Sequence, residues 1–96
     1  MSYKLRFHEK ALKEWQKLAE PLKTQFKKKL TERLENPHVI GDRLKGSTLP
    51  VYKIKLRTAG YRLVYEVNEG EITVLVLAIG KRERLEAYHT ALERLQ

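Results

Sequence analysis

The chain has 96 residues, of which 42% are hydrophobic and 33% are charged. This length predicts one domain over residues 1–96, and no apolar run approaches the ~20 residues of a membrane-spanning helix. The absence of cysteine excludes disulfides and thiolate chemistry and is typical of a cytoplasmic protein. The balance of 20 basic and 12 acidic residues gives a net charge of +8, which favours a phosphate-bearing or acidic partner. The alternative is that surplus lysine only keeps a small domain in solution.

The first part of the chain predicts a strand followed by two helices. Residues 3–8 alternate apolar and basic side chains, as a half-buried strand does. Apolar residues then recur at helical spacing from Glu9 to Ala19. Pro21 interrupts this pattern, because proline is tolerated in the first turn of a helix and not in its middle. A second helix therefore runs from about Pro21 to Glu35 and ends before Asn36-Pro37.

The second part predicts three strands and a last helix. A loop over residues 38–50 leads to a hairpin over Val51 to Val67, with Ala59-Gly60 as a two-residue turn. Ile72 to Ile79 is apolar at nearly every position, as expected of a strand covered on both faces. The last helix spans about Glu83 to Leu95. The order β-α-α-β-β-β-α predicts an α+β fold, with an antiparallel sheet packed by an N-terminal helical hairpin and a C-terminal helix.

The hairpin concentrates positive charge on one face of the predicted sheet. A two-residue turn would pair Arg57 with Arg62, Lys55 with Val64 and Lys53 with Glu66. The apolar residues of both strands then share the other face, which becomes a core surface. We therefore expect one exposed sheet face that carries Lys53, Lys55, Arg57 and Arg62.

Clustered cations have a chemical consequence for Lys55. Neighbouring positive charges lower the pKa of a lysine, which makes it a usable proton acceptor near neutral pH. The same cations bind a phosphate and stabilise the charge that builds on it. Arg82 follows the last strand and is expected near Arg62, and Tyr88 of the last helix is expected over the same cleft. This set predicts cleavage of RNA by attack of the RNA's own 2′-hydroxyl. The alternatives are that the sheet cations only form a solvated surface and that Tyr88 is only a core residue.

Neither a metal nor another cofactor is expected. The three histidines His8, His38 and His89 have no metal-ligand spacing, and the chain has no phosphate-binding glycine loop. The helical acids form no convincing carboxylate pair, because all are expected at exposed positions: Glu9, Glu14, Glu32 and Glu35.

Six short motifs, in order along almost the whole chain, point to a known family. They are ALKEWQKL (Ala11 to Leu18), KKKL (Lys27 to Leu30), RLKG (Arg43 to Gly46), YKIKLR (Tyr52 to Arg57), GYRLVYEV (Gly60 to Val67) and GKRERLEAY (Gly80 to Tyr88). Each is weak alone, but together they are specific. With them the chain resembles the RelE toxins of bacterial RelBE toxin–antitoxin systems, in the RelE/ParE superfamily.

The resemblance implies a fold, an activity and partners. It implies a microbial-ribonuclease-like domain and a ribosome-dependent endoribonuclease that cuts mRNA in the A site and so inhibits translation. No metal is needed, and 2′-hydroxyl attack would leave a 2′,3′-cyclic phosphate or 3′-phosphate and a 5′-hydroxyl. The implied partners are a RelB-like antitoxin, the 70S ribosome with its 16S rRNA, and mRNA. Operator DNA would be bound only through the antitoxin complex, and no membrane is involved.

The resemblance also implies roles for individual residues. The reactive lysines of the family fall on Lys53 and Lys55, of which Lys55 is the favoured general base. The phosphate-stabilising arginine of the family corresponds to Arg62, and the arginine likened to a general acid corresponds to Arg82. The tyrosine that orients the mRNA or stacks on it corresponds to Tyr88. Contacts to RNA and the ribosome are expected from further cations, with a solvated surface as the alternative: Lys23, Lys27, Lys28, Lys45 and Arg57.

Two other functions stay open at this point. One is a ParE-like inhibitor of DNA gyrase, and the other is an RNA- or ribosome-binding module without activity. The fold cannot separate them from a nuclease. The set of lysines, arginines and tyrosine favours the nuclease, because a binding-only inhibitor has no need of it.

Overall fold

The chain folds around a four-stranded sheet, in a computed structural model that describes residues 2–45, 48–81 and 86–95, with Glu86 described in its backbone only. Its elements are β1 (Lys4–Phe7), α1 (Glu9–Gln16), α2 (Glu20–Glu35), the short 3-10 helix η1 (Ile40–Asp42), β2 (Val51–Leu56), β3 (Tyr61–Asn68), β4 (Thr73–Lys81) and α3 (Glu86–Arg94). The predicted order of elements and the α+β class are confirmed. Helix α1 is shorter than predicted, and the predicted start of the last helix at Glu83 lies outside the described residues. In the described part of the chain, no helix is long and apolar enough to cross a membrane.

The sheet is mixed, with the strand order β1-β4-β3-β2. Strands β2, β3 and β4 are antiparallel, as predicted, but β1 runs parallel to β4. The prediction of an entirely antiparallel sheet is therefore wrong, because β1 pairs in parallel. A parallel pair needs a long crossover connection, and the two helices together with the β2–β3 hairpin supply one between β1 and β4.

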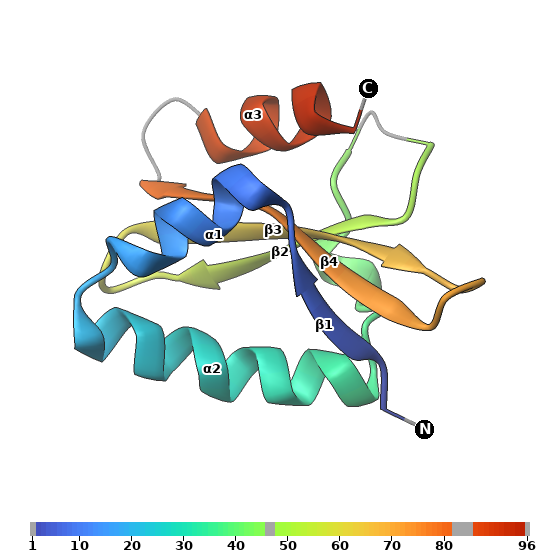
Figure 1. Ribbon diagram of the computed structural model, residues 1–96, viewed down its shortest axis with the longest axis horizontal. Coiled ribbons are helices and arrows are strands. Elements are labelled where there is room, and N and C mark those ends of the chain that lie inside the picture. The colour runs from blue at the N-terminus through green and yellow to red at the C-terminus, as the bar shows by residue number, and fades with distance from the viewer. Residues whose placement is uncertain (1, 46–47, 82–85, 96) are drawn as a thin grey trace.

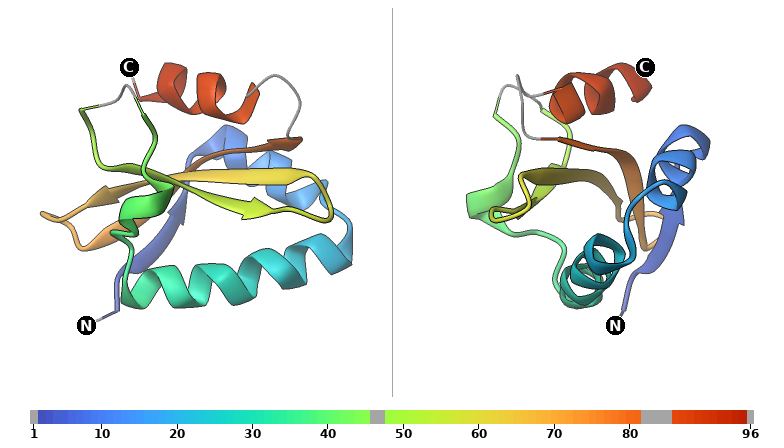
Figure 2. Two further views of the ribbon diagram at one scale, coloured as in Figure 1. Left: turned by 180° about the vertical axis from the view of Figure 1, so that it is seen from behind. Right: turned by 90° about the vertical axis from the view of Figure 1, so that its left-hand side faces the viewer.

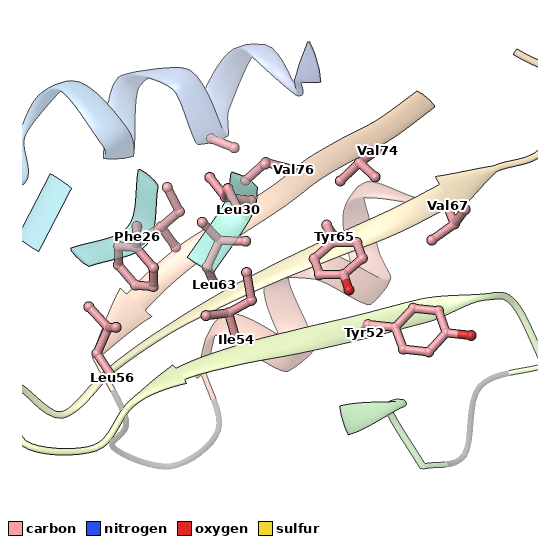
Figure 3. Close-up of a cluster of buried hydrophobic side chains, with 12 residues drawn as sticks. Phe26, Leu30, Tyr52, Ile54, Leu56, Leu63, Tyr65, Val67, Val74 and Val76 are labelled. Atoms are coloured by element: carbon pink, nitrogen blue, oxygen red, sulfur yellow. The ribbon is translucent and has the colours of Figure 1, made fainter. Parts of the chain in front are cut away.

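The larger core lies between the sheet and helix α2 (Figure 3). Because side chains alternate along a strand, β2 sends Tyr52, Ile54 and Leu56 to this face. Phe26 and Leu30 of α2 pack against them, and both are buried. The period-2 pattern of the sequence thus predicted the right core face of the hairpin.

Helix α3 lies on the opposite side of the sheet from α2 (Figure 1, Figure 2). Its buried alanines, Ala87 and Ala91, belong to a second core with Val51, Val64 and Leu77. The basic sheet face is therefore only partly open, whereas the sequence predicted it to be exposed. The reason is that α3 packs on this face against apolar side chains of the strands, among them Val64 and Leu77.

The β2–β3 turn is longer than predicted. Leu56 pairs with Tyr61, so the turn comprises the four residues 57–60, with Gly60 at a φ of 71°. The amide of Gly60 donates to the carbonyl of Leu56 over 2.8 Å and closes this turn. Only glycine adopts such a φ without strain. Arg57 lies in the turn, exposed and outside the strand.

The longer turn shifts the strand pairing by two residues. Lys55 pairs with Arg62 and Lys53 pairs with Val64, in place of the predicted partners Val64 and Glu66. A shift of two residues keeps every side chain on its face, whereas a shift of one would exchange the faces. The predicted faces are therefore correct although the predicted pairs are wrong.

Candidate active site

Three of the predicted site residues share one face of the β2–β3 hairpin. Lys53 and Lys55 come from β2 and Arg62 from β3, and all three are half-buried. Lys55 and Arg62 are direct cross-strand partners, and Gly80 of β4 lies on the other side of Arg62. Because glycine has no side chain, Arg62 has a cationic neighbour on one side and only backbone on the other.

Tyr88 reaches this face from helix α3. The centroid of its ring lies 5.7 Å from Nζ of Lys53, within the range of a cation–π contact. The same side chain packs partly against the core beneath α3. The core interpretation of Tyr88 is therefore correct for part of its side chain, while its role in the site stays a prediction that the contact with Lys53 supports.

Lys53 has an unusual electrostatic environment. Partial burial lowers the pKa of its ammonium, and the charges of Lys55, Lys45 and Arg62 lower it further, while Asp42 opposes them. The sequence led us to expect a lowered pKa at Lys55. Lys53 is also the lysine whose ammonium contacts the ring of Tyr88 on α3. A lowered pKa increases the fraction of neutral amine available to accept a proton.

A cavity of about 350 Å³ lies beside Lys53 and Tyr88. It is lined by Leu44, Lys45, Lys53, Tyr88, His89 and Leu92. A larger hollow of about 710 Å³ lies between α1 and α3, around His8 and Thr90, and none of the sequence-predicted site residues that the structure describes lines it. The smaller cavity is the better candidate, because an aromatic ring and two lysines line it.

Arg33 of α2 is a supporting residue that sequence reasoning missed. One guanidinium nitrogen donates to the carbonyl of Lys53 over 3.2 Å and to the hydroxyl of Tyr65 over 2.9 Å. The other nitrogen lies 2.5 Å from a carboxylate oxygen of Asp42. Arg33 thus ties α2 and η1 to the backbone of β2 at Lys53. No sequence signal marks it, because α2 is rich in basic residues.

The remaining predicted residues that the structure describes lie in three separate places. Lys23, Lys27 and Lys28 come from α2, which covers the other face of the sheet, and Lys23 lies 3.5 Å from Glu20. Lys45 lines the site cavity, and Arg57 lies in the hairpin turn. Arg82 lies outside the described residues. Lys81, which precedes it, pairs with Tyr61, the neighbour of Arg62 in β3.

Comparisons with known proteins agree with this architecture. Residues 5–86 match the family model described as the ParE toxin of the type II toxin–antitoxin system parDE. The chain is 50% identical to the mRNA interferase toxin RelE of Escherichia coli K12 over 95 residues. This alignment covers 99% of each chain. The structure of free E. coli RelE with two arginines replaced by alanine covers 100% of both chains, at 47% identity and a TM-score of 0.91. The toxin in the intact E. coli RelBE toxin–antitoxin complex is 49% identical, with a TM-score of 0.82 over 86% of this chain and 100% of that one.

The fold, the basic hairpin face and these matches define the class of protein as a toxin of type II toxin–antitoxin systems. Within that class, the chain belongs to the RelE family. The resemblance expected from the six sequence motifs is confirmed.

Proposed function

We propose that this chain is an mRNA interferase, a ribosome-dependent endoribonuclease that cuts mRNA in the A site and so inhibits translation. The observation that carries the proposal is the meeting of Lys53, Lys55 and Arg62 with Tyr88 on one sheet face. The name of the E. coli relative, mRNA interferase toxin RelE, supports it. A gyrase inhibitor needs no such cluster of cations around a titratable lysine.

The proposed reaction needs a base, a phosphate clamp and an acid. Lys55 takes the proton of the 2′-hydroxyl, the 2′-oxygen attacks the adjacent phosphorus, and the bond from phosphorus to the 5′-oxygen breaks. The products are a 2′,3′-cyclic phosphate and a 5′-hydroxyl. Lys53 is the second candidate for the base, because its lowered pKa favours the neutral amine.

The other site residues act on charge and orientation. Arg62, the cross-strand neighbour of Lys55, binds the phosphate and stabilises its developing charge. Arg82 is proposed as the acid that protonates the leaving 5′-oxygen. Tyr88 offers its ring to a base of the mRNA, since every base has a face that stacks on an aromatic ring.

The ribosome supplies the geometry that free mRNA lacks. Positioning of the 2′-oxygen in line with the bond that breaks lowers the barrier, and a bound A-site codon can be held in that way. We propose that five exposed or partly exposed cations contact rRNA or mRNA: Lys23, Lys27, Lys28, Lys45 and Arg57. Such phosphate contacts weaken as salt increases.

The proposed inhibitor is a RelB-like antitoxin. The related E. coli toxin is seen in a RelBE toxin–antitoxin complex, and a chain of charge +8 suits an acidic partner. Operator DNA would be bound only through that complex. Because the proposed substrate is mRNA on the translating ribosome, we place the toxin in the cytoplasm.

Primer extension on ribosomes programmed with a defined mRNA tests the proposal. The wild-type chain should produce stops within the A-site codon, and Lys55→Ala and Arg62→Ala should each reduce them by at least about a hundredfold, as removal of a catalytic base or charge-stabilising group does. Full activity of Lys55→Ala would exclude it as the base and move that role to Lys53. Intact mRNA together with inhibited DNA supercoiling would replace the nuclease by the gyrase alternative.

A further inference from the structure

Helix α3 carries Tyr88 but has few means of holding its own position. It has nine residues, which is shorter than the ~12–15 residues that an isolated helix needs in water. Its two fully buried side chains are Ala87 and Ala91, which bury a single methyl group each. Apolar burial scales with the area removed from water, so these alanines fix the pose of the helix only weakly. Tyr88 and Leu95 pack only partly against the same core, so an additional interaction at the end of the helix would help to set its tilt and rotation over the sheet.

That interaction is an ion pair between Arg94 and Glu14. The two guanidinium nitrogens donate to the two carboxylate oxygens of Glu14 over 2.9 and 3.1 Å, as a bidentate pair. The side chains of Arg94 and Glu14 are only 13% and 34% exposed, so water screens the pair less than it screens a surface pair. Sequence reasoning placed Glu14 at an exposed helical position, which is wrong because Arg94 of α3 and the amide of Ile79 in β4 bond to its carboxylate and leave it partly buried.

The same two side chains also complete the backbone hydrogen bonding of β4. Strand β1 is shorter than β4 and pairs with it only as far as Val76. The last backbone hydrogen bond between them is donated by the amide of His8 to the carbonyl of Val76. Beyond that point, Arg94 donates to the carbonyl of Leu77 over 2.6 Å, and Glu14 accepts from the amide of Ile79 over 3.1 Å. A buried strand edge needs such partners. One ion pair therefore joins α1, the uncovered edge of β4 and the end of α3.

We infer that Glu14 and Arg94 are positioning residues, which hold α3 so that Tyr88 stays over Lys53. Tyr88 and Arg94 lie six residues apart on one helix, and therefore about 9 Å apart along its axis at 1.5 Å per residue. Arg94 fixes the α1 side of this helix, while Tyr88 faces the β2 side. Without the ion pair between Arg94 and Glu14, the helix could rotate or tilt, and this would move the ring of Tyr88 away from Lys53. The inference rests on the proposed nuclease function for its kinetic consequence, but not for its structural one.

The structural test is NMR of the full chain with Glu14→Gln, which keeps an acceptor for the Ile79 amide but removes the charge. The ring current of Tyr88 shifts the side-chain protons of Lys53, and this shift should shrink in the variant. Glu32→Gln is the chemical control, and Val74→Ala, in the core beneath α2, is the control for lost stability. An unchanged Lys53 shift in folded Glu14→Gln would overturn the inference, and so would an equal loss in Val74→Ala.

The kinetic test is a double-mutant comparison in the A-site cleavage assay. Because a misplacement of about 1 Å can cost up to about a hundredfold, Glu14→Gln should reduce cleavage by about tenfold to a hundredfold. In the Tyr88→Ala background, Glu14→Gln should cause no further loss of cleavage, because the ring that Glu14 helps to position is already absent. Independent, multiplying losses would overturn the inference. If the wild-type chain does not cleave mRNA, the proposed function fails, while the NMR comparison still decides the positioning role.

Discussion

The ammonium of Lys53 on β2 lies 5.7 Å from the centroid of the Tyr88 ring on α3. This contact joins the sheet to the helix that covers its second face. It also brings together the lysine with the lowered pKa and an aromatic ring able to stack on a nucleotide base. The proposed site therefore lies between two layers of the fold, and we expect its activity to depend on their relative position.

The ring of Tyr88, rather than its hydroxyl, is expected to carry the function. Tyr88→Phe keeps the aromatic face for Lys53 and for a base, so A-site cleavage should stay within a few-fold of the wild-type rate. Tyr88→Ala removes stacking worth about 1–3 kcal/mol, so cleavage should fall by about tenfold to a hundredfold. Primer extension on programmed ribosomes measures both. An equal loss in the two variants would assign the role to the hydroxyl instead.

Lys53 is expected to lower the stability of the fold at neutral pH. Its pKa in the folded chain lies below the ordinary value of 10.5, chiefly because of partial burial and the charge of Lys55. Between the two pKa values the unfolded chain binds more protons, so stability should rise as pH rises through this window. Lys53→Met should therefore raise the melting temperature at pH 7 by up to a few degrees and remove that pH dependence.

Calorimetry between pH 7 and pH 10 checks the Lys53 prediction. The exposed Lys27→Met is the matched control and should leave the pH profile unchanged. A lower melting temperature of Lys53→Met at pH 7 would contradict the assignment. Cleavage should fall in Lys53→Met even though the fold becomes more stable, as expected where function and stability compete.

Arg33 is expected to stabilise the sheet edge beneath the site. Arg33→Leu removes donors to the carbonyl of Lys53, the hydroxyl of Tyr65 and the carboxylate of Asp42. Hydrogen bonds to charged groups contribute about 1.5–3 kcal/mol each, so the free energy of unfolding should fall by at least that amount. Urea unfolding measures the change. Asp42→Asn, which keeps an oxygen acceptor, should cost less than Arg33→Leu, and the reverse order would contradict this account.

Glu69 is expected to make the fold sensitive to acid. Its hydrogen bonds with His38 and Tyr3 hold the pKa of its carboxyl below the ordinary value of 4.5. A depressed pKa gives stability that is present above pH 4.5 and lost as pH falls through the folded value. Glu69→Gln should therefore flatten the acid side of the stability profile, as followed by circular dichroism. Glu71→Gln, which alters the exposed pair with Arg6 and a long hydrogen bond from Asn68, should leave the profile unchanged.

Much of the fold follows from local patterns in the sequence. Alternation along YKIKLR and YRLVYEV placed the apolar residues on one face and Lys53, Lys55 and Arg62 on the other. The assignment to faces was correct despite the wrong turn length, because the two-residue and four-residue turns differ by a register shift of two. The element order was correct because proline, asparagine and glycine separate the periodic segments.

What only the tertiary structure decided lies in contacts between layers. The parallel pairing of β1, the burial of Lys53 beside Tyr88, and the partners of Arg33 and Arg94 join segments that are distant along the chain. Periodicity reports which side of an element is buried, but not which other element covers it. The sequence by itself therefore determined the basic hairpin face and the family of the chain. The packing of α2 and α3 against the two faces of the sheet decided which residues hold the site together, and it is only in the folded chain that partial burial lowers the pKa of Lys53.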